Sequence, residues 1–209
     1  YYISLLSEAK DDYAIYARSP FDPKNRAVLI GTDVSSRYTR RGQEEYMRIA
    51  AYIKQTVMQK KGNYLAFFPS YRMLQDVMEC TGPQLDTSIR CICQTSGMTE
   101  EEREAFLHEF EQKRKEDEGL LGFCVMGGIF GEGIDLKEDS LIGAIIVGTG
   151  IPQICREREI LKQYYDGRNE DGFAYAYRYP GMNKVLQSAG RVIRTAQDRG
   201  VVLLLDERF

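Results

Sequence analysis

One glutamine, one glycine and two arginines near the end of the chain are spaced so that they could bind an anion. Gln187, Gly190, Arg191 and Arg194 fall on one side of a helix predicted over residues 182–195, because positions three and four apart share a face. Guanidinium groups suit phosphate, since their forked donors match its oxygens and their charge cannot be titrated away. Glycine costs about 1 kcal/mol relative to alanine in a helix interior, so Gly190 indicates that a ligand approaches the backbone. A phosphate or carboxylate partner and an ordinary solvated face both stay open.

A second candidate is a glycine-rich loop that follows the apolar run 122–126. Glycines such as Gly133 let the backbone come close to a ligand. The carboxylates of Glu132 and Asp135 would repel a phosphate, so we expect them to accept a hydrogen bond from a ribose hydroxyl or to pair with an arginine. A structural glycine turn is the alternative interpretation.

Two further groups of side chains could contact a nucleic acid. Ser70 is the predicted N-cap of a helix over residues 70–80, and the amino terminus of a helix attracts phosphate. Arg37 and Arg40 flank an aromatic residue in a basic cluster, a mixture that suits a single-stranded backbone with occasional base stacking. Serine N-caps and surface arginines are also common in proteins that bind no nucleic acid.

Short apolar runs predict the strands that must position these residues. They lie at 26–30, 64–68, 122–126, 141–147 and 201–205. Predicted helices alternate with them, at 41–60, 70–80, 99–115, 153–166 and 182–195. The runs lack polar alternation, as is typical of parallel strands covered by helices on both faces. The order therefore predicts an open parallel α/β sheet, whose ligands bind beyond the carboxyl ends of its strands.

Composition and cysteine spacing narrow the class of protein. The net charge of -3 and the pI near 5.4 argue against a wholly basic nucleic-acid binder, although a local basic groove is compatible with them. The five cysteines include no CxxC pair and there is one histidine, so we predict no metal in this segment. Cys91 and Cys93 are interpreted as small strand residues. No apolar run approaches the ~20 residues of a membrane span and no signal peptide is recognisable, so we expect a cytoplasmic protein without membrane contact.

Several segments resemble the motifs of one helicase family. Gln187-x-x-Gly190-Arg191-x-x-Arg194 resembles helicase motif VI, and residues 198–209 resemble the DinG/XPD group within superfamily 2. Gly131-Glu132-Gly133-Ile134-Asp135 is similar to motif V of that family, and Phe67-Phe68-Pro69-Ser70-Tyr71 is similar to motif IV. Ser19-Pro20-Phe21 and the strand after it resemble the family's entry into this domain, so we expect the chain to start shortly after motif III of a longer polypeptide.

The resemblance implies a RecA-like fold and the role of second motor domain in an ATP-dependent DNA helicase of DNA repair or replication. In that family the motif VI arginines, here Arg191 and Arg194, reach the γ-phosphate of ATP. Such an arginine is worth roughly 10³–10⁵ in rate in comparable NTPases. The other implied nucleotide contacts are Gln187, Gly190, Glu132, Gly133 and Asp135. The implied contacts with single-stranded DNA are Ser70, Tyr71, Gly128, Arg37 and Arg40. The family also implies 5′→3′ travel.

The lysine-bearing phosphate loop of a P-loop NTPase cannot be built from this sequence, which contains no GxxxxGK[ST] and no Gly-Lys dipeptide. We therefore expect ATP and Mg²⁺ to be bound mainly by a first RecA-like domain of the same polypeptide, and the isolated chain to hydrolyse no ATP. Asp206 and Glu207 after an apolar run superficially read as a Walker B strand, which we interpret as an ordinary strand end. We predict a monomer with one domain over residues 1–209, in which residues 1–20 form a junction.

Two other functions stay open at this point. A nucleotide-binding regulatory α/β module without motor function would keep the fold and the glycine loop but would need no paired arginines. An RNA helicase or a helicase-like nuclease is the second alternative. The nuclease would require an acidic cluster for metal-dependent cleavage, and the sequence supports none convincingly.

Overall fold

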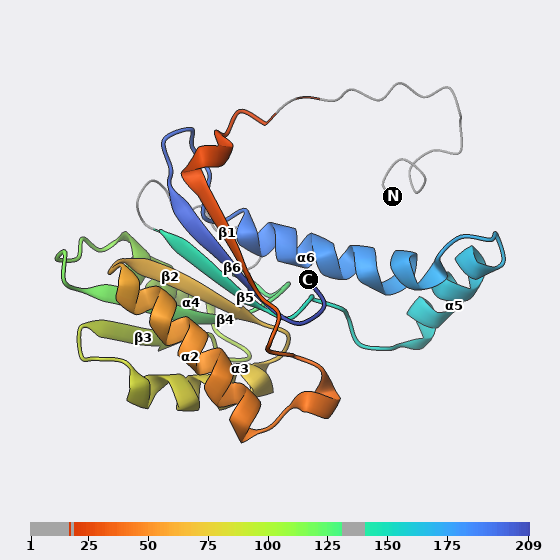
Figure 1. The fold of residues 1–209 in the computed structure, drawn as a ribbon, viewed down its shortest axis with the longest axis horizontal. Coiled ribbons are helices and arrows are strands. Elements are labelled where there is room, and N and C mark those ends of the chain that lie inside the picture. The colour runs from red at the N-terminus through yellow and green to blue at the C-terminus, as the bar shows by residue number, and fades with distance from the viewer. Residues whose placement is uncertain (1–16, 18, 131–140) are drawn as a thin grey trace.

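The chain folds around one parallel sheet (Figure 1). The computed structural model describes residues 17, 19–130 and 141–209. Within them, six strands lie in the order β1-β6-β5-β2-β4-β3, and every neighbouring pair is parallel. The strands are β1 Arg26–Gly31, β2 Asn63–Phe68, β3 Ile89–Cys93, β4 Gly119–Val125, β5 Gly143–Val147 and β6 Gly200–Leu205. The predicted parallel α/β sheet is confirmed, and the carboxyl ends of its strands share one edge.

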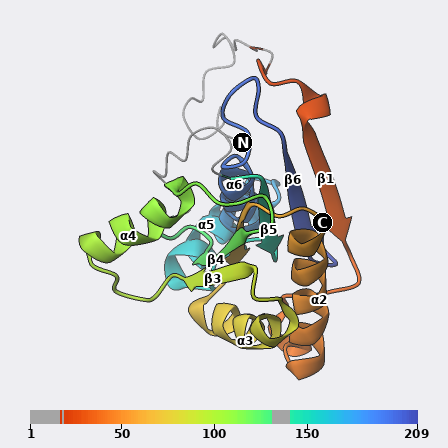
Figure 2. The same cartoon turned by 90° about the vertical axis from the view of Figure 1, so that its left-hand side faces the viewer.

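Helices cover both faces of this sheet (Figure 2). They are α2 Gln43–Gln59, α3 Tyr71–Thr81, α4 Glu100–Glu111, α5 Arg156–Asp166 and α6 Tyr179–Ala189. One hydrophobic cluster joins α2 and α3 to one face, through side chains such as Ile49 and Leu74. A second cluster joins α4 and α6 to the other face, through Phe106 and Val185. This layering leaves the two ends of the sheet, where the strands begin and finish, as the places where polar residues gather.

Apolar runs that look alike in the sequence differ in burial. Every residue of β2 and β5 is buried, as expected for central parallel strands. β1 forms an edge of the sheet instead, and its Val28, Leu29 and Ile30 side chains are about half-exposed. The prediction that helices cover both faces of every strand is therefore wrong for β1, because α2 and α6 pack over the strands further in.

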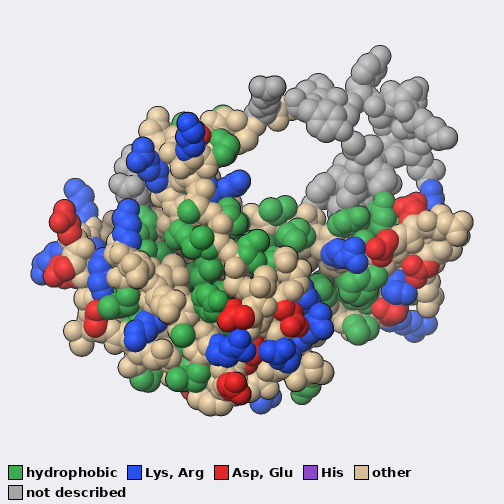
Figure 3. Space-filling model, in the orientation of Figure 1, with side chains coloured by type: hydrophobic (Ala, Val, Ile, Leu, Met, Phe, Trp, Pro, Cys, Tyr) green, Lys and Arg blue, Asp and Glu red, His purple; other side chains and the backbone are tan. Residues whose placement is uncertain are grey.

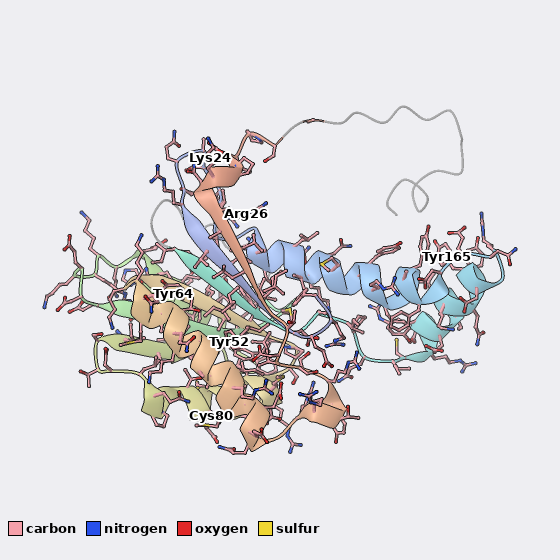
Figure 4. The ribbon with its side chains drawn as sticks, in the orientation of Figure 1. Lys24, Arg26, Tyr52, Tyr64, Cys80 and Tyr165 are labelled. Carbon is pink, nitrogen blue, oxygen red and sulfur yellow. The ribbon has the colours of Figure 1, made fainter. Side chains whose placement is uncertain are left out.

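Two elements were not among the predicted runs. β3 contains Cys91 and Cys93, which confirms that these cysteines are strand residues. A π-helix, Ala174–Arg178, leads directly into α6. The ring of Tyr175 in the π-helix stacks on Tyr165 of α5, with 4.0 Å between the ring centroids. Aromatic packing therefore holds α5 against the π-helix that precedes α6, and Figure 4 labels Tyr165 there.

Parts of the predicted organisation fall outside the described residues. Most of the predicted junction, residues 1–20, lies there, and so do Glu132, Gly133 and Asp135 of the glycine-rich loop. In the part of the chain that the structure does describe, no helix is long and apolar enough to cross a membrane.

Candidate functional site

The two arginines lie at the end of the sheet where the strands begin. α6 starts next to the carboxyl end of β5, since a Cβ on Gly181 would be 2.7 Å from the carbonyl oxygen of Thr149. Further along the chain, Val192 packs against Gly200, the first residue of β6. α6 therefore runs antiparallel to the strands. The segment after it, which we call the arginine turn (residues 190–198), lies at the amino edge of the sheet.

The helix that carries the glutamine is shorter than predicted. α6 ends at Ala189, and Gly190 is its C-cap, so the prediction of a helix to residue 195 is wrong. The amides of Arg191 and Val192 donate to carbonyl oxygens three residues back, which tightens the last turn. The helix stops because Val192 is buried in the core, and that packing turns the chain back toward β6.

Gly190 accordingly has a different local role from the one predicted. It terminates the helix and does not lie in its interior. A Cβ at this position would approach only the carbonyl oxygens of Leu186 and Gln187, both in its own helix. The surface over Gly190 is therefore open, and the exposed Gln187 lies one turn before it.

A single carboxylate organises the arginine turn. Asp198 Oδ2 accepts hydrogen bonds from the backbone amides of Arg194 and Thr195, both at 2.7 Å, and Oδ1 accepts one from the Thr195 hydroxyl at 2.6 Å. Burial alone would raise the pKa of Asp198, but the hydrogen bonds from Thr195 and from the Arg194 amide outweigh it and lower the pKa below its ordinary value. Asp198 therefore fixes the backbone from which Arg194 extends.

Both arginines are held within the protein. Arg191 and Arg194 are partly buried, and the Nε atom of each is inaccessible to solvent. Each also takes part in an interaction within the chain. Both side chains are therefore partly enclosed by the fold instead of extending freely from a helix face.

The other predicted residues gather at the opposite edge. Ser70 caps α3, its hydroxyl accepting a hydrogen bond from the Met73 amide at 3.4 Å. Tyr71 follows it, and its hydroxyl accepts a hydrogen bond from Gln94 Nε2 at 3.0 Å. Gly128 lies against the same amide, since a Cβ there would be 3.2 Å from Gln94 Nε2. Ser70, Tyr71, Gln94 and Gly128 thus form one group, which we call the carboxyl-edge cluster.

Gln94 joins this cluster although nothing in the motifs singled it out. It follows β3, is almost fully buried, and its Oε1 accepts a hydrogen bond from the Val125 amide at 2.9 Å. One side-chain amide thereby ties the ends of β3 and β4 to the start of α3. Its position directly after a strand was the available signal, but the sequence indicated strand residues only at Cys91 and Cys93 and no apolar run there.

Arg37 and Arg40 lie elsewhere on that edge, in a network of ion pairs. Arg37 is 3.1 Å from Glu207, and Arg40 is 3.7 Å from Glu207 and 3.5 Å from Glu45. Both arginines remain about half-exposed. The carboxylates offset their charge, which makes them weaker anchors for phosphate than their sequence suggests.

Asp206 is a structural residue, as its interpretation as a strand end predicts. It is fully buried and accepts hydrogen bonds from Arg208 Nε at 2.6 Å and from the Ser36 hydroxyl at 2.7 Å. Burial alone would raise the pKa of this carboxyl, but Arg208 and Ser36 hold it below its ordinary value. Its oxygens therefore tie the end of β6 to the segment after β1. Among the described residues no cluster of acidic, histidine or cysteine side chains could hold a metal ion.

Known proteins share this sequence and this fold. The helicase C-terminal domain family matches residues 53–209. ATP-dependent DNA helicase XPD of Sulfolobus acidocaldarius is 28% identical over 190 residues, which cover 86% of this chain and 31% of that protein. A regulator of telomere elongation helicase 1 homolog of Drosophila yakuba is 28% identical over 200 residues, covering 87% and 20%.

Solved structures give the same result. One named XPD helicase superposes with a TM-score of 0.71 at 26% identity, over 88% of this chain and 32% of that one. The predicted RecA-like fold is thereby confirmed. The chain spans less than a third of the length of the two curated relatives. It belongs to the helicase C-terminal domain family, in its XPD-like branch.

Proposed function

We propose that the chain is the second motor domain of an ATP-dependent DNA helicase of the DinG/XPD type, acting in DNA repair or replication. The observation that carries the proposal is the arginine turn. Arg191 and Arg194 lie three residues apart beside the exposed Gly190, and Asp198 holds the backbone amide of Arg194. Two guanidinium groups so close together beside an exposed glycine suit a polyphosphate that another domain presents.

In this proposal Arg191 and Arg194 neutralise the charge that develops on the transferred phosphoryl group. The exposed Gln187 orients the nucleotide from one turn away, and Glu132, Gly133 and Asp135 add contacts from the glycine-rich loop. The donors present fit the phosphates. Among the described residues no cluster of side chains could hold Mg²⁺. A first RecA-like domain of the same polypeptide would hold the Mg²⁺ and most of the ATP.

The carboxyl-edge cluster would hold single-stranded DNA. The Ser70 turn presents the amino terminus of α3, whose free amides and dipole favour a phosphate. The backbone at Gly128 is next to it, with the Gln94 amide between the two. Arg191 and Arg194 and the DNA contacts then lie at opposite edges of one sheet, so that ATP-driven closure of the two motor domains would move the DNA contacts together with the arginines.

Arg194→Ala in the full-length protein tests this proposal. We expect DNA-stimulated ATP hydrolysis to fall by roughly 10³-fold or more, because the transition state loses a fixed cation. Affinity for single-stranded DNA should change less than about twofold, since the substitution lies far from the carboxyl-edge cluster. Arg199→Ala removes an exposed arginine just outside the turn and should leave both quantities unchanged. Hydrolysis that survives Arg194→Ala would contradict the motor function and favour a regulatory nucleotide-binding module.

A further inference from the structure

A hollow of about 660 Å³ lies between the segment after β1, the start of α2 and the outer face of α3. Its lining includes Tyr38, Arg41, Tyr46, Arg72 and Asp76. Arg72 belongs to the first turn of α3, two residues after Ser70. The hollow therefore continues the surface on which the Ser70 turn would hold a DNA phosphate. Figure 3 shows acidic and basic side chains mixed over this part of the molecule, and Figure 4 marks Cys80 at its far end on α3.

Tyr38 gives this hollow an open aromatic wall. Its side chain is 83% exposed, the largest exposed fraction among the large hydrophobic residues of the described chain. The guanidinium carbon of Arg41 lies 5.7 Å from the ring centroid, so a cation covers one face and the other faces solvent. An uncovered ring beside an arginine is the arrangement on which bases of single-stranded nucleic acids stack, because every base has a π-face.

Two arginines in the hollow keep their charge available. Within the described residues, Arg41 and Arg72 form no ion pair, in contrast to Arg37 and Arg40. Arg41 Nε donates to the Ser36 carbonyl oxygen at 3.2 Å, which fixes the side chain while its terminal nitrogens stay available. These two guanidinium groups are better phosphate ligands than the pair that the sequence suggested.

The acidic residues of the hollow determine which part of a nucleotide enters it. Asp76 and Glu79 lie on the same face of α3 as Arg72, about 6 and 10 Å beyond Arg72 along the helix axis, on the side away from Ser70. Burial and the Asp76 carboxylate raise the pKa of Tyr46, which also lines the hollow, more than Arg41 and Arg72 lower it. Asp76 and Glu79 would repel a phosphate but not an uncharged base, so the phosphate is expected to bind beside Arg72 and Arg41.

We propose that this hollow is a nucleotide subsite for single-stranded DNA, in which Tyr38 stacks on a base while Arg72 and Arg41 bind its phosphate. The subsite rests on the proposed helicase function and extends its DNA track beyond the Ser70 turn. Stacking on Tyr38 holds the base apart from its neighbours along the strand. Asp76 and Glu79 keep the phosphate at the end of the hollow nearest Ser70. The stacking contact tolerates any base, as translocation along DNA requires.

The test uses the full-length protein and fluorescein-labelled oligothymidylates in which a single abasic site is placed at successive positions. Fluorescence anisotropy should show one position at which the abasic site weakens binding roughly 5- to 100-fold, the loss expected for one stacked base. Tyr38→Ala should weaken binding of the intact oligonucleotide to the same extent and remove the penalty at that position. Tyr38→Phe should keep the profile of the original protein, since the ring is retained. Arg72→Ala should lower the slope of log affinity against log salt by about 1.

Tyr164→Ala is the matched control, because Tyr164 is also exposed and also has an arginine over its ring, Arg168 at 5.4 Å. Tyr164→Ala should leave unchanged the loss of affinity that the abasic site causes at its one sensitive position. A profile that Tyr38→Ala does not alter would overturn the subsite while leaving the proposed function intact. Failure of the original protein to bind any oligonucleotide would instead overturn the proposed function.

Discussion

The arginine turn and the carboxyl-edge cluster lie at opposite ends of the same sheet and are built from different chemistry. Asp198, an ionised carboxylate, fixes the backbone of the arginine turn. Gln94, an uncharged amide, connects three elements of the carboxyl-edge cluster. The ionised Asp198 holds the backbone amides of the arginine turn in place. The uncharged Gln94 places no anion next to the Ser70 turn, where a carboxylate would repel a phosphate. The two regions should therefore be separable by mutation and should respond differently to pH.

The largest effect should come from changing the cation itself. Arg191→Lys keeps the positive charge but loses the planar fork, so we expect DNA-stimulated ATP hydrolysis to fall by about 10²–10³-fold. Single-strand affinity should stay within about twofold. Steady-state hydrolysis and anisotropy on one preparation measure both. Full activity in Arg191→Lys would show that charge alone suffices and that the turn need not orient a bidentate donor.

Gln94→Leu should disrupt the carboxyl-edge cluster. The substitution leaves the Val125 amide without its acceptor and releases Tyr71, so single-strand affinity should fall about tenfold and unfolding free energy by about 1–3 kcal/mol. ATP hydrolysis without DNA should not change. Gln75→Leu, at an exposed glutamine of α3, is the control and should have neither effect. Unchanged DNA affinity in a folded Gln94→Leu protein would show that Gln94 does not support the DNA contacts.

Acid should loosen the arginine turn through Asp198. The pKa of this carboxyl is lowered from 3.8 in the folded protein, so its contribution to stability is present above about pH 4 and is lost as pH falls through the folded value. Asp198→Asn should cost about 1 kcal/mol at pH 7, at the low end because solvent screens the site, and less at pH 3, where part of the ionised form is lost. Urea unfolding at the two pH values measures this difference. An equal cost at both values would mean that the ionised form does not matter.

Arg37→Ala and Arg40→Ala should have the smallest effects. Their ion pairs with Glu207 and Glu45 are half-exposed and worth about 0–1 kcal/mol, and their charge is already offset. We expect less than about a twofold change in single-strand affinity for either, compared with a larger loss for Arg72→Ala. A larger loss in Arg37→Ala than in Arg72→Ala would reverse this assignment.

Much of the fold could be predicted because buried parallel strands are continuously apolar. β2 and β5 are such runs, and both are central strands. β1 has the same pattern at an edge, since apolarity along a run does not state how many neighbours the strand has. β3 mixes exposed and buried positions and contains Arg90, so it produced no apolar run.

The site was predictable only as separate pieces. Motif spacing identified Arg191 and Arg194 but overestimated their helix, because a helical period continues past Gly190 in sequence while the burial of Val192 turns the chain. Gln94 and Arg72 needed the strand order and the packing of α3, which no local pattern supplies. The roles of Glu132, Gly133 and Asp135 stay predictions, since these residues lie outside the described part of the chain.

The separation of the two regions is tested most directly by measuring DNA-stimulated ATP hydrolysis at saturating DNA, together with single-strand affinity, in Arg194→Ala and Gln94→Leu of the full-length protein. We predict that Arg194→Ala loses hydrolysis by roughly 10³-fold or more and keeps its affinity. Gln94→Leu should lose affinity about tenfold and keep its hydrolysis rate once DNA is saturating. Loss of both properties in each variant would contradict the account, because it would show that the two edges of the sheet form a single site.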